Sequence, residues 1–152
     1  MNIIDFSVEI KENNKIFDNI NYLEDNKKLD LTGKKILVVD DNKINIKVAI
    51  TLLKKYNCEI DTVLSGYECL EKIDNNNSFD MILLDEMMPG MTGTETMKKL
   101  KKKGYKKPIV VFTADAVTGQ REHYLSQGFD DYLEKPINKY ELERVLEKFL
   151  VN

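Results

Sequence analysis

The stretch DMILLDEMMPGMTG (residues 80–93) decides the fold. Its residues 81–84 form a continuous apolar run of strand length, which is typical of a parallel strand buried on both faces. The run ends at Asp85, and the Pro-Gly and Thr-Gly pairs that follow indicate a loop. Two runs of the same kind, at 36–39 and 109–112, predict two more central strands.

Helical and strand patterns alternate outward from these runs. Residues 59–64 alternate apolar and polar side chains, as in a strand nearer the sheet edge, and residues 131–134 form a short fifth strand. Helical spacing or capping residues mark five further segments, at 44–56, 66–73, 94–103, 118–127 and 140–150. The first of these helices is predicted to have one apolar face that holds Ile44, Val48, Leu52 and Tyr56. The alternation predicts an α/β fold, a five-stranded parallel sheet with helices on both faces and right-handed crossovers.

The first 33 residues differ in composition from the rest. They are rich in Asn, Asp, Lys and Glu, and only Phe6, Val8 and Ile10 alternate with polar residues as a short strand would. We expect residues 1–33 to be a partly disordered linker or the tail of an upstream domain. Residues 34–152 are expected to form one domain with its own core.

Charge and cysteine content exclude several classes of protein. The net charge of −3 comes from both signs mixed along the chain, which argues against nucleic acid as a partner. Cys58 and Cys69 form no CxxC pair, so we expect reduced thiols in a cytoplasmic protein. No apolar run approaches the length of a membrane span, and no membrane contact is expected of this domain.

Polar residues gather where the predicted strands end. Asp40 and Asp41 follow the first strand, Asp85 and Glu86 the third, and the fourth and fifth run into Thr113 and Lys135. Ligands of open α/β sheets bind beyond the carboxyl ends of the strands, so these side chains are expected to meet at one edge.

That set of groups suits phosphoryl transfer. Close carboxylates repel each other unless a cation lies among them, and Mg²⁺ prefers oxygen ligands. An ammonium and a hydroxyl would then neutralise and bind the phosphoryl oxygens. One carboxylate must be the nucleophile, and Asp85, on a central strand between the other groups, is the best candidate.

Four pieces of the sequence carry a family resemblance, and their order and spacing agree as well. They are ILVVDDNKIN (36–45), DMILLDEMMPGMTG (80–93), VFTADA (111–116) and GFDDYLEKPI (128–137). With these pieces, residues 34–150 resemble the receiver domains of two-component response regulators. The resemblance implies a flavodoxin-like (βα)5 fold with strand order 2-1-3-4-5.

The resemblance also implies a metal site and a phosphoacceptor. Asp40 and Asp41 would organise Mg²⁺, the cofactor. Asp85 would accept the phosphoryl group and also bind the metal. The backbone carbonyl of Met87 would be a further metal ligand.

The remaining family residues concern the phosphoryl group and the switch. Thr113 and Lys135 would bind the phosphoryl oxygens, and Tyr132 matches the aromatic residue that changes rotamer when Thr113 moves. The bond between Lys135 and Pro136 is expected to be cis. Phosphorylation would change the surface of the fourth helix, fifth strand and fifth helix, roughly residues 118–150.

Other residues have plainer interpretations. Met87, Met88 and Met91 are interpreted as packing residues, although the apolar side chain of Met87, two residues after Asp85, favours slow dephosphorylation. Glu86 either strengthens the attraction for the metal or faces solvent, and the second is expected. His123, the only histidine, is expected to be exposed and not catalytic.

Three functions compete. The leading one is a receiver domain that takes phosphate from a histidine kinase or phosphotransfer protein. A phosphatase of the haloacid dehalogenase type would need a second acid two residues after the nucleophile, where this chain has Met87. A degenerate receiver used only for binding is disfavoured because every key residue is present. The domain itself is therefore not expected to be a turnover enzyme.

The wider context is an expectation from the same resemblance. The pieces at 36–49 and 128–137 look most like the C-terminal receiver of a hybrid sensor histidine kinase, which would make the parent chain a kinase. Residues 4–10 would then be the last strand of its ATP-binding domain, and no output domain is expected after the fifth helix. The alternative is a stand-alone single-domain response regulator. We expect a monomer or a weak phosphorylation-dependent dimer.

Overall fold

The computed structural model describes residues 29–76, 78–114 and 117–151. Five parallel strands form one sheet in the order β2-β1-β3-β4-β5. The strands are β1 (Lys35–Val39), β2 (Glu59–Val63), β3 (Met81–Asp85), β4 (Ile109–Thr113) and β5 (Asp131–Glu134). The helices are α2 (Lys43–Leu53), the short 3₁₀ helix η1 (Lys54–Tyr56), α3 (Gly66–Asn75), α4 (Gly93–Lys102), α5 (Gln120–Gln127) and α6 (Lys139–Leu150). The predicted fold class and strand order are confirmed, whereas the strand expected at 4–10 lies outside the described residues.

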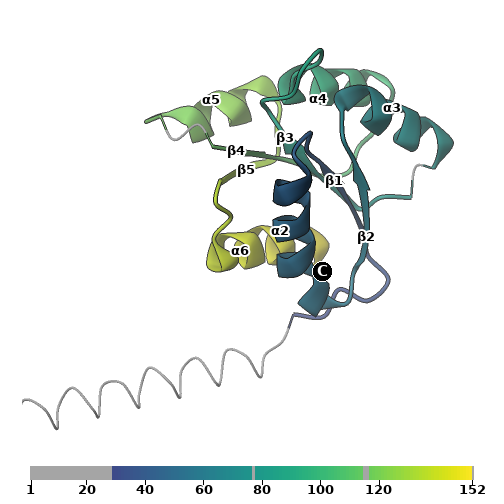
Figure 1. The fold of residues 1–152 in the computed structure, drawn as a ribbon, viewed down its shortest axis with the longest axis vertical. Helices are drawn as coiled ribbons and strands as arrows, with labels where there is room; N and C mark the ends of the chain where they lie inside the picture. Colours follow the sequence, from purple (N-terminus) through teal and green to yellow (C-terminus); the bar gives the residue numbers. More distant parts are fainter. Residues whose placement is uncertain (1–28, 77, 115–116, 152) are drawn as a thin grey trace, which may run out of the picture.

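Helices cover both faces of the sheet and create two cores. Figure 1 shows α2 and α6 on one side of the strands and α3, α4 and α5 on the other. Within β1, Ile36 and Val38 belong to the core under α2 and α6, whereas Leu37 and Val39 belong to the core on the opposite face. Both faces of the central strands are therefore buried from solvent, which explains why their sequences are continuous apolar runs.

The predicted apolar face of α2 is wrong in part. Ile44 and Val48 are 70% and 44% exposed, and the residues buried against the sheet are Ile46, Ala49 and Leu53. The helix begins at Lys43, because the side chain of Asn42 accepts hydrogen bonds from its first turn. The helix packs on the sheet through the arc that contains residues 46, 49 and 53.

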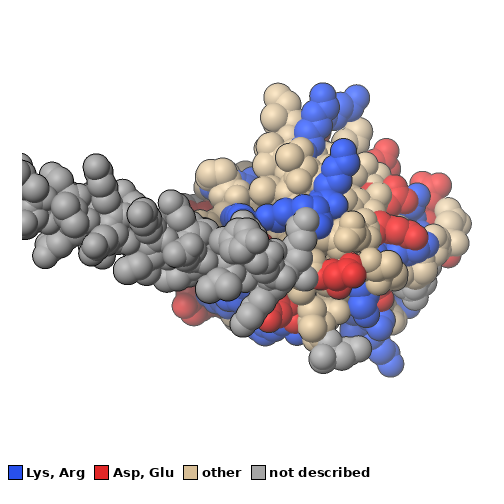
Figure 2. All heavy atoms as spheres, turned by 90° about the horizontal axis from the view of Figure 1, so that it is seen from below, with Lys and Arg blue, Asp and Glu red and all other residues tan. Residues whose placement is uncertain are grey.

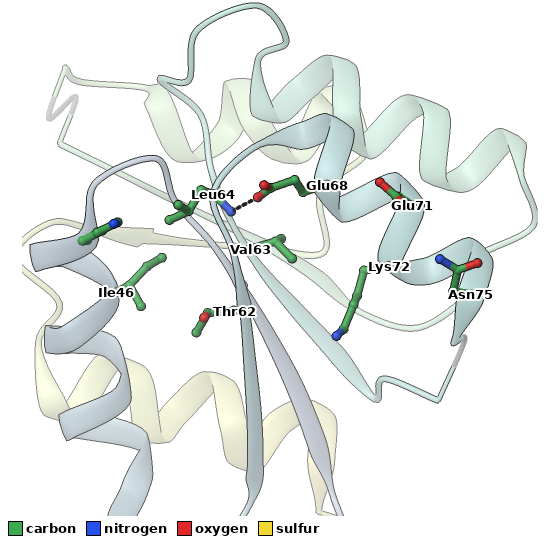
Figure 3. Close-up of a pocket in the computed structure, with 9 residues that line it drawn as sticks. Ile46, Thr62, Val63, Leu64, Glu68, Glu71, Lys72 and Asn75 are labelled. Atoms are coloured by element: carbon green, nitrogen blue, oxygen red, sulfur yellow. Dashed lines mark hydrogen bonds between the residues drawn. The ribbon is translucent and has the colours of Figure 1, made fainter.

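Carboxylates bind two of the outward-facing amides along the outer edge of β2. The amides of Glu59 and Asp40 bond across the β1–β2 pair, so the amides of residues 60, 62 and 64 point outward. The Thr62 amide donates to Asp61 Oδ1 at 2.9 Å, and the Leu64 amide donates to Glu68 Oε2 at 2.6 Å (Figure 3). A pocket of about 560 Å³ lies beside this edge between α2 and α3, and none of the predicted site residues lines it.

Candidate functional site

The sheet brings the predicted site residues to one edge. Asp85 is the last residue of β3, and Asp40 follows β1, whose Val39 pairs with Leu84. Asp40 and Asp85 therefore end neighbouring central strands. Thr113 ends β4, next to β3, and Lys135 follows β5 at the same end of the sheet.

Three carboxylates converge at this edge. One oxygen from each of Asp40, Asp41 and Asp85 lies within 4.8 Å of the other two. Asp40 and Asp85 are buried, and Asp41 is exposed, so the cluster opens to solvent on one side. Asp40 Oδ1 also accepts a hydrogen bond from the Asn42 amide at 2.8 Å. The cluster is an all-oxygen donor set, which fits a hard divalent cation such as Mg²⁺.

Lys135 joins the two buried carboxylates. Its Nζ lies 2.8 Å from Asp40 Oδ2 and 3.0 Å from Asp85 Oδ1. The ammonium also lies 4.7 Å from the ring centroid of Phe112, and the Lys135 amide donates to the Thr113 carbonyl at 2.9 Å. The peptide bond between Lys135 and Pro136 is cis, as the resemblance implies. The Lys135 ammonium is thus bound by two carboxylates, and the Lys135 backbone is fixed by the end of β4.

Burial makes Asp85 a weaker acid than usual. Desolvation raises its pKa from 3.8 to about 6, the hydrogen bond from Lys135 opposes that rise, and the charge of Asp40 adds to it. A single ammonium does not balance two buried carboxylates, so the site attracts further positive charge.

Glu86 does not face solvent, contrary to the expectation. It is 8% exposed, and its carboxylate accepts hydrogen bonds from the amide and the hydroxyl of Thr94 in the first turn of α4. Met88 and Met91 are buried packing residues as expected, whereas the Met87 side chain is 72% exposed. The Met87 amide points back to Asp85 Oδ1 at 3.4 Å.

The predicted switch residue lies in an aromatic stack. Tyr132 is half-buried, and its ring stacks on that of Tyr124 from α5 with centroids 5.8 Å apart and an interplanar angle of 14°. Tyr124 also contacts Phe129 edge to face. His123, the neighbour of Tyr124, is exposed as predicted.

A buried charge cluster beside the switch residue escaped the sequence reasoning. Asp131 at the start of β5 is fully buried and pairs with Arg121 at 3.1 Å, Arg144 at 2.9 Å and Lys148 at 3.4 Å. Burial alone would raise the pKa of Asp131, but hydrogen bonds from Arg144 and from the Tyr132 amide outweigh it and hold the pKa at about 2. The carboxylate thereby links α5, β5 and α6.

Fold and site together define a class. The domain has the doubly wound order 2-1-3-4-5, and its acidic site lies beyond the carboxyl ends of β1 and β3, where the strand order reverses. It is an α/β domain of the flavodoxin-like class with a carboxylate–ammonium site at the topological switch point.

Comparisons with known proteins identify the family. The family profile described as the response regulator receiver domain matches residues 36–147. Hybrid signal transduction histidine kinase L of Dictyostelium discoideum is 37% identical over 122 residues, which cover 76% of this chain and 7% of that protein. The sensor protein GacS of Pseudomonas syringae pv. syringae is 33% identical over 120 residues, which cover 76% of this chain and 13% of that protein.

Solved structures agree with the sequence relatives. The receiver domain of Francisella response regulator 1452 superimposes with a TM-score of 0.70 at 30% identity, covering 78% of this chain and 97% of that one. The receiver domain of a sensor histidine kinase from Pseudomonas aeruginosa PAO1, which has a magnesium ion coordinated in its active-site cleft, gives a TM-score of 0.70 at 30% identity, covering 80% and 100%.

The chain therefore belongs to the response regulator receiver domain family. It is a receiver domain of two-component signalling, homologous to the receiver regions of hybrid histidine kinases.

Proposed function

We propose that Asp85 accepts a phosphoryl group from a phosphohistidine of a histidine kinase or phosphotransfer protein. The observation that carries the proposal is the position of Lys135, which holds Asp85 and Asp40 together at the open edge of the sheet. In the transfer, a carboxylate oxygen of Asp85 forms a bond to phosphorus. The phosphorus–nitrogen bond breaks, and its electron pair returns to the histidine.

Mg²⁺ is the cofactor of this proposal. Asp40, Asp41 and Asp85 would hold it with their carboxylates, and Met87 with its backbone carbonyl. Bound there, the ion supplies positive charge to the phosphoryl oxygens. The described carboxylates fit this role because they are close together, are all oxygen donors and are only partly balanced by Lys135.

Lys135 and Thr113 bind the phosphoryl oxygens, and Tyr132 communicates the change to the surface. Thr113 is fully buried at the end of β4, and its carbonyl already accepts from the Lys135 amide. A pocket of about 490 Å³ borders Tyr132, and its ring would move into that space. The Tyr124 ring, stacked on Tyr132, would carry that movement to α5, so that the surface of α5, β5 and α6 changes.

The relatives support a proposal for the partners and the setting of this domain. The chain spans 7% of the length of histidine kinase L and 13% of that of GacS, and we propose that it is the C-terminal receiver of a hybrid histidine kinase. A stand-alone regulator is the alternative, and the reading frame upstream of Met1 distinguishes the two. We propose a monomer or a weak phosphorylation-dependent dimer that binds no nucleic acid. Figure 2 supports the last point for the face it shows, where acidic and basic side chains both occur.

The domain boundary and the cellular location are part of the proposal. Residues 1–33 are a linker or tail, of which 1–28 lie outside the described residues, and 34–152 are the receiver domain. Leu31 is buried, and its amide donates to the Tyr56 carbonyl, which anchors the end of the linker to the domain. None of the described helices has the length and apolar character to cross a bilayer. Two free cysteines, Cys58 and Cys69, support a cytoplasmic location.

Phosphorylation with acetyl phosphate and Mg²⁺ tests the proposal. Wild-type protein is expected to gain one phosphoryl group, detected by intact mass, and Asp85→Asn is expected to gain none. Equal labelling of the two proteins would refute Asp85 as the acceptor. Repeated turnover of a small phosphate ester would instead favour the phosphatase alternative.

A further inference from the structure

Glu86 is a buried carboxylate that the phosphotransfer reaction does not use. It follows Asp85 directly, yet it does not belong to the acidic cluster. Its carboxylate accepts from the Thr94 amide at 3.0 Å and from the Thr94 hydroxyl at 2.5 Å. Those donors lie in the first turn of α4, where unpaired amides and the helix dipole favour a negative charge. The side chain therefore ties the residue after the acceptor to the helix that follows.

The backbone of Glu86 closes the same loop. Its carbonyl accepts from the Met88 amide at 3.1 Å and from the Gly93 amide at 3.0 Å. A Cβ atom at Gly93 would lie only 2.3 Å from the Asp85 carbonyl oxygen, so α4 touches the backbone of the acceptor strand directly. The loop from residue 87 to residue 92 thus begins next to Glu86, and the residue after its end, Gly93, is hydrogen-bonded to Glu86.

Met87 is the first residue of this loop. Its amide points to Asp85 Oδ1, and its carbonyl is the backbone ligand of the proposed metal site. No side-chain rotation can redirect a backbone carbonyl, because the peptide planes on either side fix its direction. Its direction consequently depends on what holds the two ends of the loop.

We infer that Glu86 is a positioning residue that, through its hydrogen bonds to Thr94, fixes the direction of the Met87 carbonyl and so sets the affinity for Mg²⁺. The inference rests on the proposed function, because it assumes a metal at the carboxylate cluster. Glu86 acts on the ion through the backbone and does not touch it. It is thereby distinct from Asp40, Asp41 and Asp85, which supply ligand oxygens.

Charge and position can be separated experimentally. Glu86→Gln removes a negative charge near the metal and would weaken binding by electrostatics alone. Thr94→Val removes the hydroxyl donor and changes no charge. Thr94→Ser keeps the hydroxyl and should rescue binding. Glu71→Gln is the matched control, since Glu71 is exposed on α3 and its replacement changes the net charge equally without touching the loop.

Mg²⁺ titration of the full chain, followed by the amide resonances of nitrogen-labelled protein, measures the affinity directly. Loss of an outer-shell partner weakens metal binding by about 10- to 100-fold, and we expect about tenfold for Thr94→Val because the effect passes through the backbone. Thr94→Ser and Glu71→Gln should stay within about twofold of wild type. The Met88 and Gly93 amides should exchange with solvent faster in Thr94→Val, and amides of β1 should not.

The outcomes separate two failures. If wild type binds Mg²⁺ and Thr94→Val binds it equally well, the inference is wrong. If only Glu86→Gln loses affinity for Mg²⁺, the effect of Glu86 comes from its charge and not from its hydrogen bonds to Thr94. If wild type does not bind Mg²⁺ at all, the proposed function fails with it. Circular dichroism confirms that each variant is folded at the titration temperature, and Thr94→Ala, which also removes the hydroxyl without changing charge, serves as the second variant should Thr94→Val unfold.

Discussion

Replacing Asp85 with asparagine is expected to stabilise the metal-free protein at neutral pH. Because burial raises the pKa of Asp85 from 3.8 to about 6, the folded protein holds this proton more tightly than the unfolded chain does. As the pH rises from 3.8 to 6, the unfolded chain loses the proton first, and the folded state loses stability. An asparagine cannot ionise, so the variant avoids that loss. Its side chain can still accept from Lys135, which also keeps its bond to Asp40.

The size of the effect follows from the shift. About two pKa units at about 1.4 kcal/mol per unit give about 3 kcal/mol in the free energy of unfolding. Solvent reaches the cluster past the exposed Asp41 and screens part of this energy, so we expect about 2 kcal/mol. Mg²⁺ should reverse the order. At about one hundred times its dissociation constant, a ligand that binds only the folded state stabilises by about 2.7 kcal/mol. That exceeds the expected advantage of the variant, which lacks one metal ligand.

Urea unfolding followed by circular dichroism measures this difference. Wild type and Asp85→Asn are compared in EDTA at neutral pH and at about pH 4, where the folded-state carboxyl is protonated and the advantage should largely vanish. Asp61→Asn is a suitable control, because the hydrogen bond from Lys72 lowers the pKa of Asp61 and the same substitution should not stabilise there. The reasoning is refuted if Asp85→Asn is no more stable than wild type at neutral pH, or if its advantage is the same at both pH values.

Three further perturbations test other parts of the structure. Asp131→Asn should lower the free energy of unfolding by about 1–2 kcal/mol at neutral pH, because the folded state holds the pKa of Asp131 at about 2. The substitution also leaves its partially exposed partners Arg121 and Lys148 without their carboxylate. That loss should shrink as the pH falls toward 2 in urea titrations, and an unchanged difference would contradict it. Gly93→Ala places a methyl group 2.3 Å from the Asp85 carbonyl oxygen, and should cost about 1–3 kcal/mol and slow labelling by acetyl phosphate. Labelling at the wild-type rate would argue against that contact. Removing Mg²⁺ with EDTA should abolish labelling of Asp85 and added Mg²⁺ should restore it, whereas undiminished labelling in EDTA would exclude the metal from the reaction.

The sheet could be predicted because local patterns specify it. The continuous apolar run at residues 81–84 requires burial on both faces, and only a central strand offers that. The sequence was a poorer guide to which face of α2 packs on the sheet. The apolar residues Ile44 and Val48 have the right spacing, but the packing of Ile46, Ala49 and Leu53 on the sheet decides which arc is buried. Helical spacing alone does not contain that information.

Residues at strand ends were predictable, and residues that act through tertiary contacts were not. Asp40 and Asp85 follow directly from where their strands stop. Glu86 is the next residue in sequence, yet its direction depends on a loop that returns α4 to the end of β3. Asp131 resembles an ordinary first residue of a strand, because Arg144 lies 13 positions later in the chain and comes near only when α6 packs on the sheet. A charged residue at the start of a strand, followed by a helix with basic residues, was the one available signal.

The bonds at the site suggest how a change at Asp85 would reach the far side of the domain. Lys135 contacts both buried acids through its ammonium and binds the Thr113 carbonyl through its amide, so it joins the ends of β1, β3, β4 and β5. A phosphoryl group on Asp85 would compete with Asp40 for the Lys135 ammonium. Because Lys135 directly follows β5, a shift of Lys135 would also move the residues of that strand. Tyr132 and Asp131 lie on that short strand, one stacked on α5 and the other paired with α5 and α6. Because β5 is an edge strand with only β4 beside it, its displacement breaks fewer backbone hydrogen bonds than displacement of a central strand would, which makes it the sheet element best suited to transmit the signal.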